Sequence, residues 1–274
     1  MRYLALILLS AVMLPAQIGT PLPKPNAPEQ PPAAAPQTAT PEDLASARQA
    51  RAVLDKMIAA LGGPAYLNIQ DMEQNGRVYG FDHNGDAADA GAPFVRYWKW
   101  PDKDRLELLK HRDWILVYNG NDANEITYHG PHPMDAKALK GYLERRSYSL
   151  EYVIREWLKD PTVALYYDGQ TISESKQAEK ISIIGREHRG VTLFIDANSF
   201  LPLRKTYTTR DPETGDRVEE AESFDNYRLL QGVQTPTRIT RYKNDIMTAQ
   251  RFISDVKYNT GVPDSKFDLS LAAK

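Results

Sequence analysis

Two short stretches carry residue types and spacings that could do chemistry. His111-Arg112-Asp113 has the order found in kinase catalytic loops, but the asparagine that should follow falls one residue late, at Asn119, and no glycine-rich loop precedes it. Asp82-His83-Asn84-Gly85-Asp86 has the first ligands of a calcium loop, yet its sixth and twelfth positions are Ala87 and Pro93 instead of glycine and glutamate. We therefore interpret both stretches as turns, and we predict no metal site and no cofactor.

Histidine and carboxylate pairs give no stronger signal for catalysis. His129 and His132 flank Gly130-Pro131, which excludes a helix, and no cysteine or HExxH pattern accompanies them as a zinc site would require. Glu219-Glu220 and Glu222 alternate along an expected strand, which is typical of a solvent-facing surface. A carboxylate pair for hydrolysis stays open as an alternative without a positive signal. We predict no catalytic residues and a protein that is not an enzyme.

Apolar residues give the clearest signal, and they favour binding. Strands in which apolar and polar residues alternate, as in Leu106/Leu108 and Leu193/Ile195, should present one apolar face of a sheet. The four tryptophans fit either a core or a ligand cage, and both interpretations are kept. The candidate ligand-binding residues are Trp98, Trp100, Leu106, Leu108, Trp114, Leu150, Val153, Ile154, Trp157, Leu158, Leu193 and Ile195.

Five of these candidates belong to a helical flap between Met134 and Asp160. From Leu150 to Leu158 they recur at i, i+3, i+4, i+7 and i+8, so they form one apolar stripe of a helix. A second short helix precedes them, and Asp160-Pro161 ends the flap. Two interpretations remain open: a plug that fills the open end of a sheet, or a lid that closes a ligand cavity.

The elements that must position these residues are mostly strands. A helix begins at the Thr40 cap and ends at Gly62-Gly63, and it is followed by about a dozen strand candidates joined by short turns such as Asn119-Gly120. Short links imply antiparallel neighbours. We predict a mainly β protein with α, in which a single curved antiparallel sheet forms a half-open β-barrel with an N-terminal helix and a mid-chain helical lid. So few helices leave part of a large apolar sheet face uncovered, which is where a ligand cavity would lie.

Composition and charge narrow the partners. The 274 residues are 42% hydrophobic and 26% charged, with a formal net charge of −2 and interspersed signs. This pattern fits a globular chain and gives no basic field for nucleic acid. The sequence contains no cysteine, which excludes disulfides and a lipid-modified N-terminal cysteine.

The N-terminal region divides into two parts before the folded domain. Residues 1–16 pair Arg2 with a short apolar run and end in Leu14-Pro15-Ala16, which predicts a cleaved secretory signal peptide, with an uncleaved anchor as the weaker alternative. Residues 17–41 are rich in proline and alanine and should form a disordered linker. Residues 42–271 would then form one folded domain in the periplasm.

Several short motifs follow one another along the expected strands. They are Pro101-Asp102-Lys103-Asp104-Arg105, Val191-Thr192-Leu193-Phe194-Ile195-Asp196, Phe200-Leu201-Pro202-Leu203, Asp225-Asn226-Tyr227 and Gly232-Val233-Gln234-Thr235-Pro236. Together with the order of elements, these motifs resemble the lipoprotein-localisation carriers and their LolA/LolB-like relatives, and the likeness covers most of residues 44–269. It implies a half-open barrel lidded by helices that holds lipoprotein acyl chains in the periplasm. In the carriers an arginine before the second-strand proline holds the lid, whereas here that position is Trp100, before Pro101.

The leading hypothesis is an exported protein that binds the acyl chains of a lipid or lipoprotein in an apolar cavity, with peripheral membrane contact as part of that role. The alternative from another class is an envelope sensor or scaffold of the same fold that binds a protein partner. A hydrolase ranks third. The sequence does not identify the lipid, the partners that would deliver and receive it, or the oligomeric state.

Overall fold

The computed structural model describes residues 40–270, apart from 89, 110, 112 and 212–213. The predicted signal peptide, residues 1–16, and all but the last two residues of the predicted linker, 17–41, lie outside the described residues. No helix in the described range is long and apolar enough to cross a membrane. The bounds of the predicted domain, 42–271, stay a prediction.

One antiparallel sheet contains all thirteen strands of the described residues. Its order is β6-β5-β4-β3-β2-β1-β13-β12-β11-β10-β9-β8-β7, so the first and last strands are neighbours at its centre, and β6 and β7 are its two edges. The sheet is open, because these edges do not pair with each other within the described part. The strands are β1 (Asp71–Gly80), β2 (Ala92–Lys99), β3 (Lys103–Leu108), β4 (Trp114–Asn119), β5 (Asp122–Thr127), β6 (Gly130–Pro133), β7 (Ala164–Ser173), β8 (Lys176–Ile184), β9 (Gly190–Asp196), β10 (Pro202–Arg210), β11 (Arg217–Leu230), β12 (Val233–Lys243) and β13 (Ile246–Tyr258).

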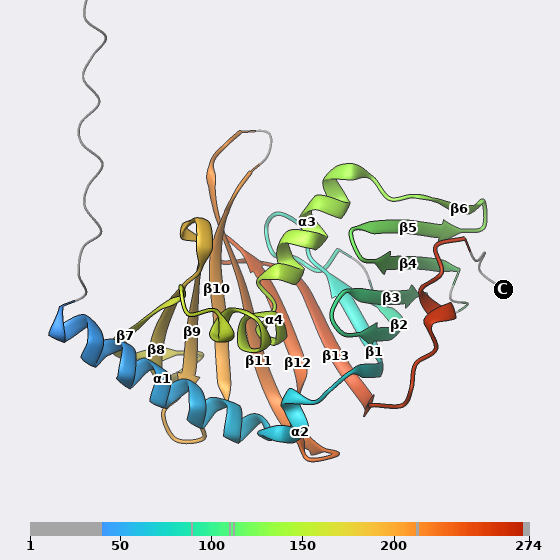
Figure 1. Cartoon of the computed structure of the whole chain (residues 1–274). Helices are drawn as coiled ribbons and strands as arrows, with labels where there is room; N and C mark the ends of the chain where they lie inside the picture. Colours follow the sequence, from blue (N-terminus) through green and yellow to red (C-terminus); the bar gives the residue numbers. More distant parts are fainter. Residues whose placement is uncertain (1–39, 89, 110, 112, 212–213, 271–274) are drawn as a thin grey trace, which may run out of the picture. The chain divides into compact units, whose positions relative to one another are not determined.

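The helical flap is the connection between the two edges of this sheet. The chain leaves β6, passes through α3 (Ala136–Ser147), α4 (Leu150–Arg155) and the short 3₁₀ turn η1 (Trp157–Lys159), and enters β7 at the opposite edge. The flap therefore has to cross the sheet, and Figure 1 shows α3 and α4 lying over its face. The predicted mainly β architecture with a mid-chain helical segment is confirmed. The single helix expected from Leu150 to Leu158 instead ends at Arg155 and continues as the 3₁₀ turn.

The N-terminal helix α1 (Pro41–Leu61) begins and ends as predicted. Thr40 accepts a hydrogen bond from the backbone of Asp43, whose carboxylate bonds back to Thr40, so both ends of a capping box are present. At the other end Gly62 adopts φ 126°, which a side chain would disfavour. The short helix α2 (Pro64–Leu67) then leads into β1, while two 3₁₀ turns, η2 (Arg186–His188) and η3 (Asp264–Phe267), complete the helical elements.

Two local features depart from what residue types predict. Strand β6 contains Pro131 and Pro133, which remove backbone donors, but at an edge strand this costs little. Asp168-Gly169 is a residue pair that predicts a turn, but the pair lies inside β7, where the pairing with β8 shifts register. The turn itself is made by Glu174 and Ser175, which both have positive φ.

The main core lies between the flap, α1 and strands β8 and β9. Leu193 and Ile195 of β9 are fully buried there beside Val153 and Ile154 of α4. Trp157 packs so closely that a Cβ added at Gly185 would lie 3.2 Å from its ring. The clean alternation of β9 thus marks the core-facing side of the sheet, as the sequence predicted.

Alternation of apolar and polar residues predicts a solvent-exposed outer face, but this face of the sheet is covered in part. Ile115, Val117 and Ile126 of β4 and β5 point to this face and are covered by Val262 and Phe267 of the C-terminal segment. Backbone carbonyls of that segment accept hydrogen bonds from the side chains of β3, β4 and β5. An apolar layer on both faces explains why β4 reads as a continuous apolar run.

Candidate functional site

A cavity of about 360 Å³ lies between the inner face of the sheet and the flap. Strands from both halves of the sheet, β1–β4 and β10–β13, contribute to its wall, so the sheet curves around it. Helices α3 and α4 cover it. The volume falls within the range of about 300–1,000 Å³ that is usual for small-molecule sites.

One end of the cavity is largely apolar. Leu61 at the end of α1, Ile69 before β1, and Met72 line this end together with Val233 at the start of β12. Tyr258, near the end of β13, shares a 2.8 Å hydrogen bond with Thr235 and so presents its ring to the cavity. This end could hold a hydrocarbon group away from water.

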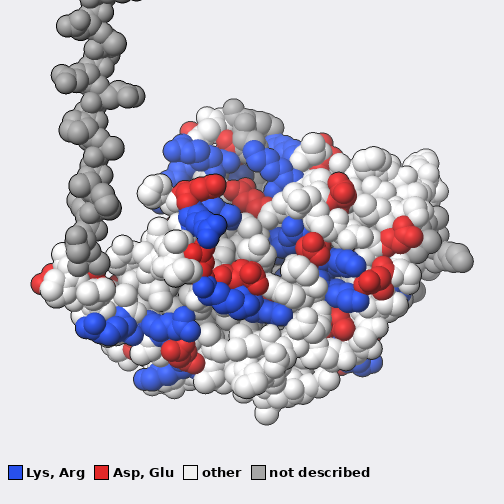
Figure 2. All heavy atoms as spheres, in the orientation of Figure 1, with Lys and Arg blue, Asp and Glu red and all other residues white. Residues whose placement is uncertain are grey.

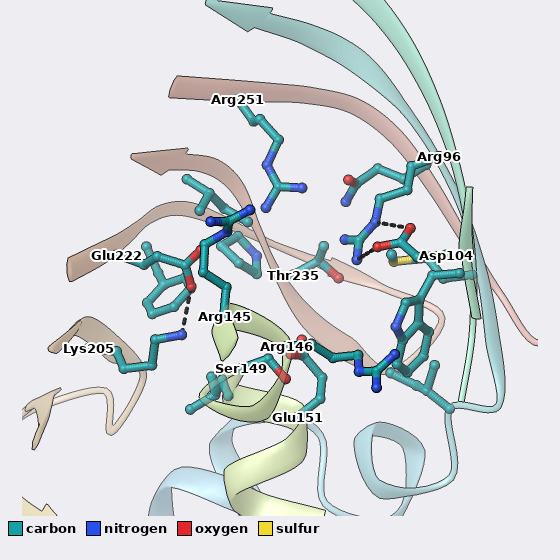
Figure 3. A pocket seen from close by; sticks show the side chains of 18 of the residues that line it. Arg96, Asp104, Arg145, Arg146, Ser149, Glu151, Lys205, Glu222, Thr235 and Arg251 are labelled. Atoms are coloured by element: carbon teal, nitrogen blue, oxygen red, sulfur yellow. Dashed lines mark hydrogen bonds and ion pairs between the residues drawn. The ribbon is translucent and has the colours of Figure 1, made fainter. Parts of the chain in front are cut away.

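The other end contains a charged band built by cross-strand neighbours. Lys205 of β10 lies opposite Glu222 of β11, which lies opposite Arg241 of β12. The Glu222 carboxylate accepts one hydrogen bond from Lys205 Nζ, shown in Figure 3, and another from Arg241 Nε, each at 2.8 Å. Burial alone would raise the pKa of the Glu222 carboxyl, but the positive charges of Lys205 and Arg241 outweigh it and hold that pKa well below its usual range.

A second ion pair closes the opposite wall. Arg96 of β2 donates two hydrogen bonds, both 2.8 Å, to the carboxylate of Asp104 on β3. Tyr142 of α3 donates to the same carboxylate at 3.1 Å, and its ring stacks on Tyr118 with centroids 3.5 Å apart. Burial, and then the negative charge of Asp104, raise the pKa of Tyr142 well above its usual value, so the phenol stays protonated.

Two arginines anchor the flap at other points. Arg146 of α3 donates to the carbonyl oxygens of Gly120 at 2.6 Å and Asp102 at 3.3 Å. Arg155 of α4 donates to the carbonyl of Ile69 at 2.6 Å, and its guanidinium lies 3.8 Å from the centre of the Trp100 ring. Charged and neutral polar side chains therefore dominate the attachment of α3. Figure 2 shows Lys and Arg interspersed with Asp and Glu on the outer surface of this side of the molecule.

Of the twelve predicted ligand-binding residues, Trp98, Leu106 and Leu150 line the cavity. The other nine lie elsewhere. Trp100 stacks under Arg155, Leu108 packs in a small core beside β1 and β13, and Trp114 is 41% exposed, with its indole nitrogen bonded to Glu125. The remaining six belong to or pack against the main core, and they are Val153, Ile154, Trp157, Leu158, Leu193 and Ile195. Ligand binding by any of the twelve stays a prediction.

Sequence reasoning missed the charged band. The expectation that Glu222 faces solvent is wrong, since its side chain is 18% exposed and turned into the cavity. Lys205 is 1% exposed and lies opposite Leu193 in the strand pairing. A lysine on the apolar side of a sheet is a strong signal for a site, but it becomes visible only once the pairing with Leu193 is known.

Comparison with known proteins gives matches by structure alone. No protein-family model matches the sequence, and no curated protein sequence matches it. A DUF1329 family protein from Desulfovibrio piger superposes with a TM-score of 0.54 at 14% identity, over 80% of this chain and 97% of that one. A domain assigned as an outer membrane lipoprotein-sorting protein, from Vibrio parahaemolyticus, superposes with a TM-score of 0.53 at 9% identity, over 81% and 97%. At the level of the fold, the predicted likeness to lipoprotein-sorting carriers is confirmed.

Proposed function

We propose that this protein is an exported binding protein that holds the acyl chains of a lipid or lipoprotein in the cavity beneath α3 and α4. The observation that carries the proposal is the cavity itself: about 360 Å³ with an apolar end, inside the fold shared with a lipoprotein-sorting domain. The role includes no covalent chemistry. The protein would act in the periplasm, after export directed by a signal peptide at residues 1–16 that is then cleaved.

Energetics favour a hydrocarbon occupant. Each buried methylene contributes roughly 0.8 kcal/mol, so a ten-carbon chain would contribute about 8 kcal/mol before the costs of association. Ordering the cover would offset part of this. Helix α3 has no fully buried residue, so an occupant that touches it would add contacts to the stacking of Tyr142 on Tyr118. Trp98, Leu106 and Leu150 line the cavity, and we expect these three predicted residues to contact the hydrocarbon chain.

The direct test is to purify the protein from its native envelope under mild conditions, extract it with organic solvent, and identify co-purifying lipids by mass spectrometry. We expect stoichiometric acylated lipid or lipoprotein. Protein that carries no lipid and forms a stable complex with another envelope protein would overturn the carrier role and favour the sensor or scaffold role.

Displacement of a hydrophobic dye tests the location of the site. Leu106→Gln places a polar amide in the cavity wall and should weaken dye and fatty-acyl binding at least tenfold. Ile172→Gln, at a position of β7 that is 70% exposed, is the matched control and should bind as the unmodified protein does. Circular dichroism establishes that both variants fold. Unchanged binding by a folded Leu106→Gln variant would place the site elsewhere.

A further inference from the structure

The cavity wall carries more positive than negative charge. Seven of its lining side chains are arginine or lysine, and three are carboxylates. Asp104 is engaged by Arg96, and Glu222 is shared between Lys205 and Arg241. Arg146 and Arg155 donate to backbone carbonyls. Among the residues that the structure describes, no hydrogen bond or ion pair engages the guanidinium groups of the two remaining cations, Arg145 and Arg251.

Arg251 is the more unusual of these two cations. It is placed on β13, opposite Val78 of β1 and Ile239 of β12, so its nearest neighbours across the sheet are apolar. Burial, and then the positive charges of Arg241 and Arg96, lower the pKa of Arg251. A guanidinium nevertheless stays protonated at neutral pH. A charge in this environment is costly unless an opposite charge accompanies it.

Two further polar groups in the same cavity lack partners. Gln74 and Tyr66 are 4% and 6% exposed, and neither Oε1 of Gln74 nor the hydroxyl of Tyr66 has a hydrogen-bond partner among the described residues. Both side chains line the cavity, and Gln74 lies opposite Arg96 in the strand pairing. Buried polar atoms are normally hydrogen-bonded, so two unpartnered ones in one cavity indicate an occupant that carries polar atoms. Rotating the Gln74 amide by 180° would place its NH2 group, which is a donor, where Oε1 lies.

The polar and apolar ends are separated along the strands. Val233 and Arg241 are both on β12, eight residues apart, which corresponds to about 26 Å of extended strand. The hydrocarbon core of a bilayer is about 30 Å thick, so a lipid chain in one leaflet extends about 15 Å. A molecule whose head lies near Arg251 could therefore place one such chain along the cavity toward Val233.

We propose that the cavity takes an anionic amphiphile: a carboxylate or phosphate head between Arg251 and Arg145, with its acyl chain directed toward Met72 and Val233. The inference rests on the proposed function and names its ligand class. Figure 3 shows Arg251 reaching in from the sheet and Arg145 rising from the flap into the same region. An anion between them would join the cover to the sheet, a contact that a neutral amphiphile cannot make.

The test compares probes that share one chain and differ in the head. Dodecanoate and dodecyl phosphate carry the two anionic heads, dodecanol carries a neutral one, and inorganic phosphate carries no chain. Dissociation constants are measured by isothermal titration calorimetry on delipidated protein. The variants are Arg251→Gln and Arg145→Gln. Lys257→Gln, which removes a positive charge from the exposed side of the same strand β13, is the control.

We expect at least one anionic probe to bind tenfold or more tightly than dodecanol. Arg251→Gln and Arg145→Gln should each reduce this preference at least fivefold while leaving dodecanol binding unchanged, and Lys257→Gln should change neither. The better of the two anionic probes identifies the head as carboxylate or phosphate. Arg145 is on an exposed helix, so its variant keeps the test decisive if Arg251→Gln does not fold.

Three other outcomes would each overturn the anionic head, the acyl-binding function or the amphiphile. Equal binding of anionic and neutral probes, or a preference that survives both arginine variants, overturns the anionic head and leaves the acyl-binding function in place. No binding of any chain overturns both. Binding of inorganic phosphate as tightly as dodecyl phosphate, lost in Arg251→Gln, would mean a free-anion site and overturn the amphiphile.

Discussion

Helices α3 and α4 follow each other in the chain but contact the sheet in different ways. Val153 and Ile154 of α4 are 0% and 4% exposed in the main core, and Trp157 continues this packing beyond the helix. None of the twelve residues of α3 is fully buried, Tyr142 being partly buried, and its contacts to the sheet run through Tyr142 and Arg146. The plug and the lid were alternatives for the whole flap. The structure gives α4 the environment of a plug and α3 the environment of a lid.

This difference follows from residue types. Apolar packing against β8 and β9 is close and cooperative, so α4 should open only when the domain unfolds. At a partly exposed surface, hydrogen bonds to water can replace the polar contacts of α3 at a small net cost in free energy. We therefore expect α3 to detach from the sheet while the core stays intact. We therefore expect α3 to be the element that moves, next to a fixed α4, when a long hydrocarbon chain enters.

The largest expected effect is on the α4 side. Trp157→Ala should lower the free energy of unfolding of the ligand-free protein by about 3–5 kcal/mol, because it leaves a cavity in the main core. Urea denaturation followed by circular dichroism measures this. Trp114→Ala, at a tryptophan that is 41% exposed, is the control and should change stability by less than about 1 kcal/mol. An unchanged urea midpoint for Trp157→Ala would remove the contrast between the helices.

The second effect concerns the charged band beneath the flap. Glu222→Gln leaves Lys205 and Arg241 without their shared carboxylate and should cost about 3 kcal/mol at pH 7. The folded-state pKa of Glu222 lies below its unfolded value, so its contribution is complete above the unfolded pKa and is lost as the pH falls through the folded one. The difference between the unmodified protein and the variant should therefore shrink below about pH 4.5.

A matched control for this effect exists on the same strand. Glu219 of β11 is exposed, so Glu219→Gln should leave stability within about 0.5 kcal/mol at every pH. A difference for Glu222→Gln that stays constant from pH 7 to pH 3 would show that its carboxylate contributes no charge-dependent stability.

The sequence predicted the regular parts of this fold well and the site only in part. Capping at Thr40, the apolar alternation of Leu193 and Ile195, and the flap between the strand blocks all reflect local rules, so they were predictable. The cavity depends on which strands become neighbours. Only the pairing of β10 with β9 and β11 places Lys205 beside Leu193 and Glu222, and a sequence does not state that pairing.

The third prediction tests the α3 side directly by hydrogen exchange. Without ligand, amides of α3 should exchange faster than those of α4, whose residues share the opening free energy of the core. A ligand at about one hundred times its dissociation constant stabilises the bound form by about 2.7 kcal/mol, so exchange in α3 should slow about a hundredfold. Exchange in the core-packed α4 should change less. Equal protection of both helices with and without ligand would return α3 to the role of a plug.

The smallest expected effect lies where the two helices meet the sheet. There the guanidinium of Arg155 on α4 lies 3.8 Å from the centre of the Trp100 ring, and Trp100 directly follows β2. Such a contact contributes about 1 kcal/mol. A double-mutant cycle with Trp100→Leu and Arg155→Lys isolates it, because lysine keeps the charge but loses the planar stacking.

We expect a coupling energy of about 1 kcal/mol in urea denaturation of the ligand-free protein, and the same value with dodecanoate bound, because α4 stays in place while α3 moves. The exposed pair Arg51 and Asp55 on α1 is the control, with a coupling of about 0.5 kcal/mol or less. A Trp100–Arg155 coupling that appears only with ligand bound would mean that α4 also closes on binding, and the division between a fixed α4 and a mobile α3 would fail.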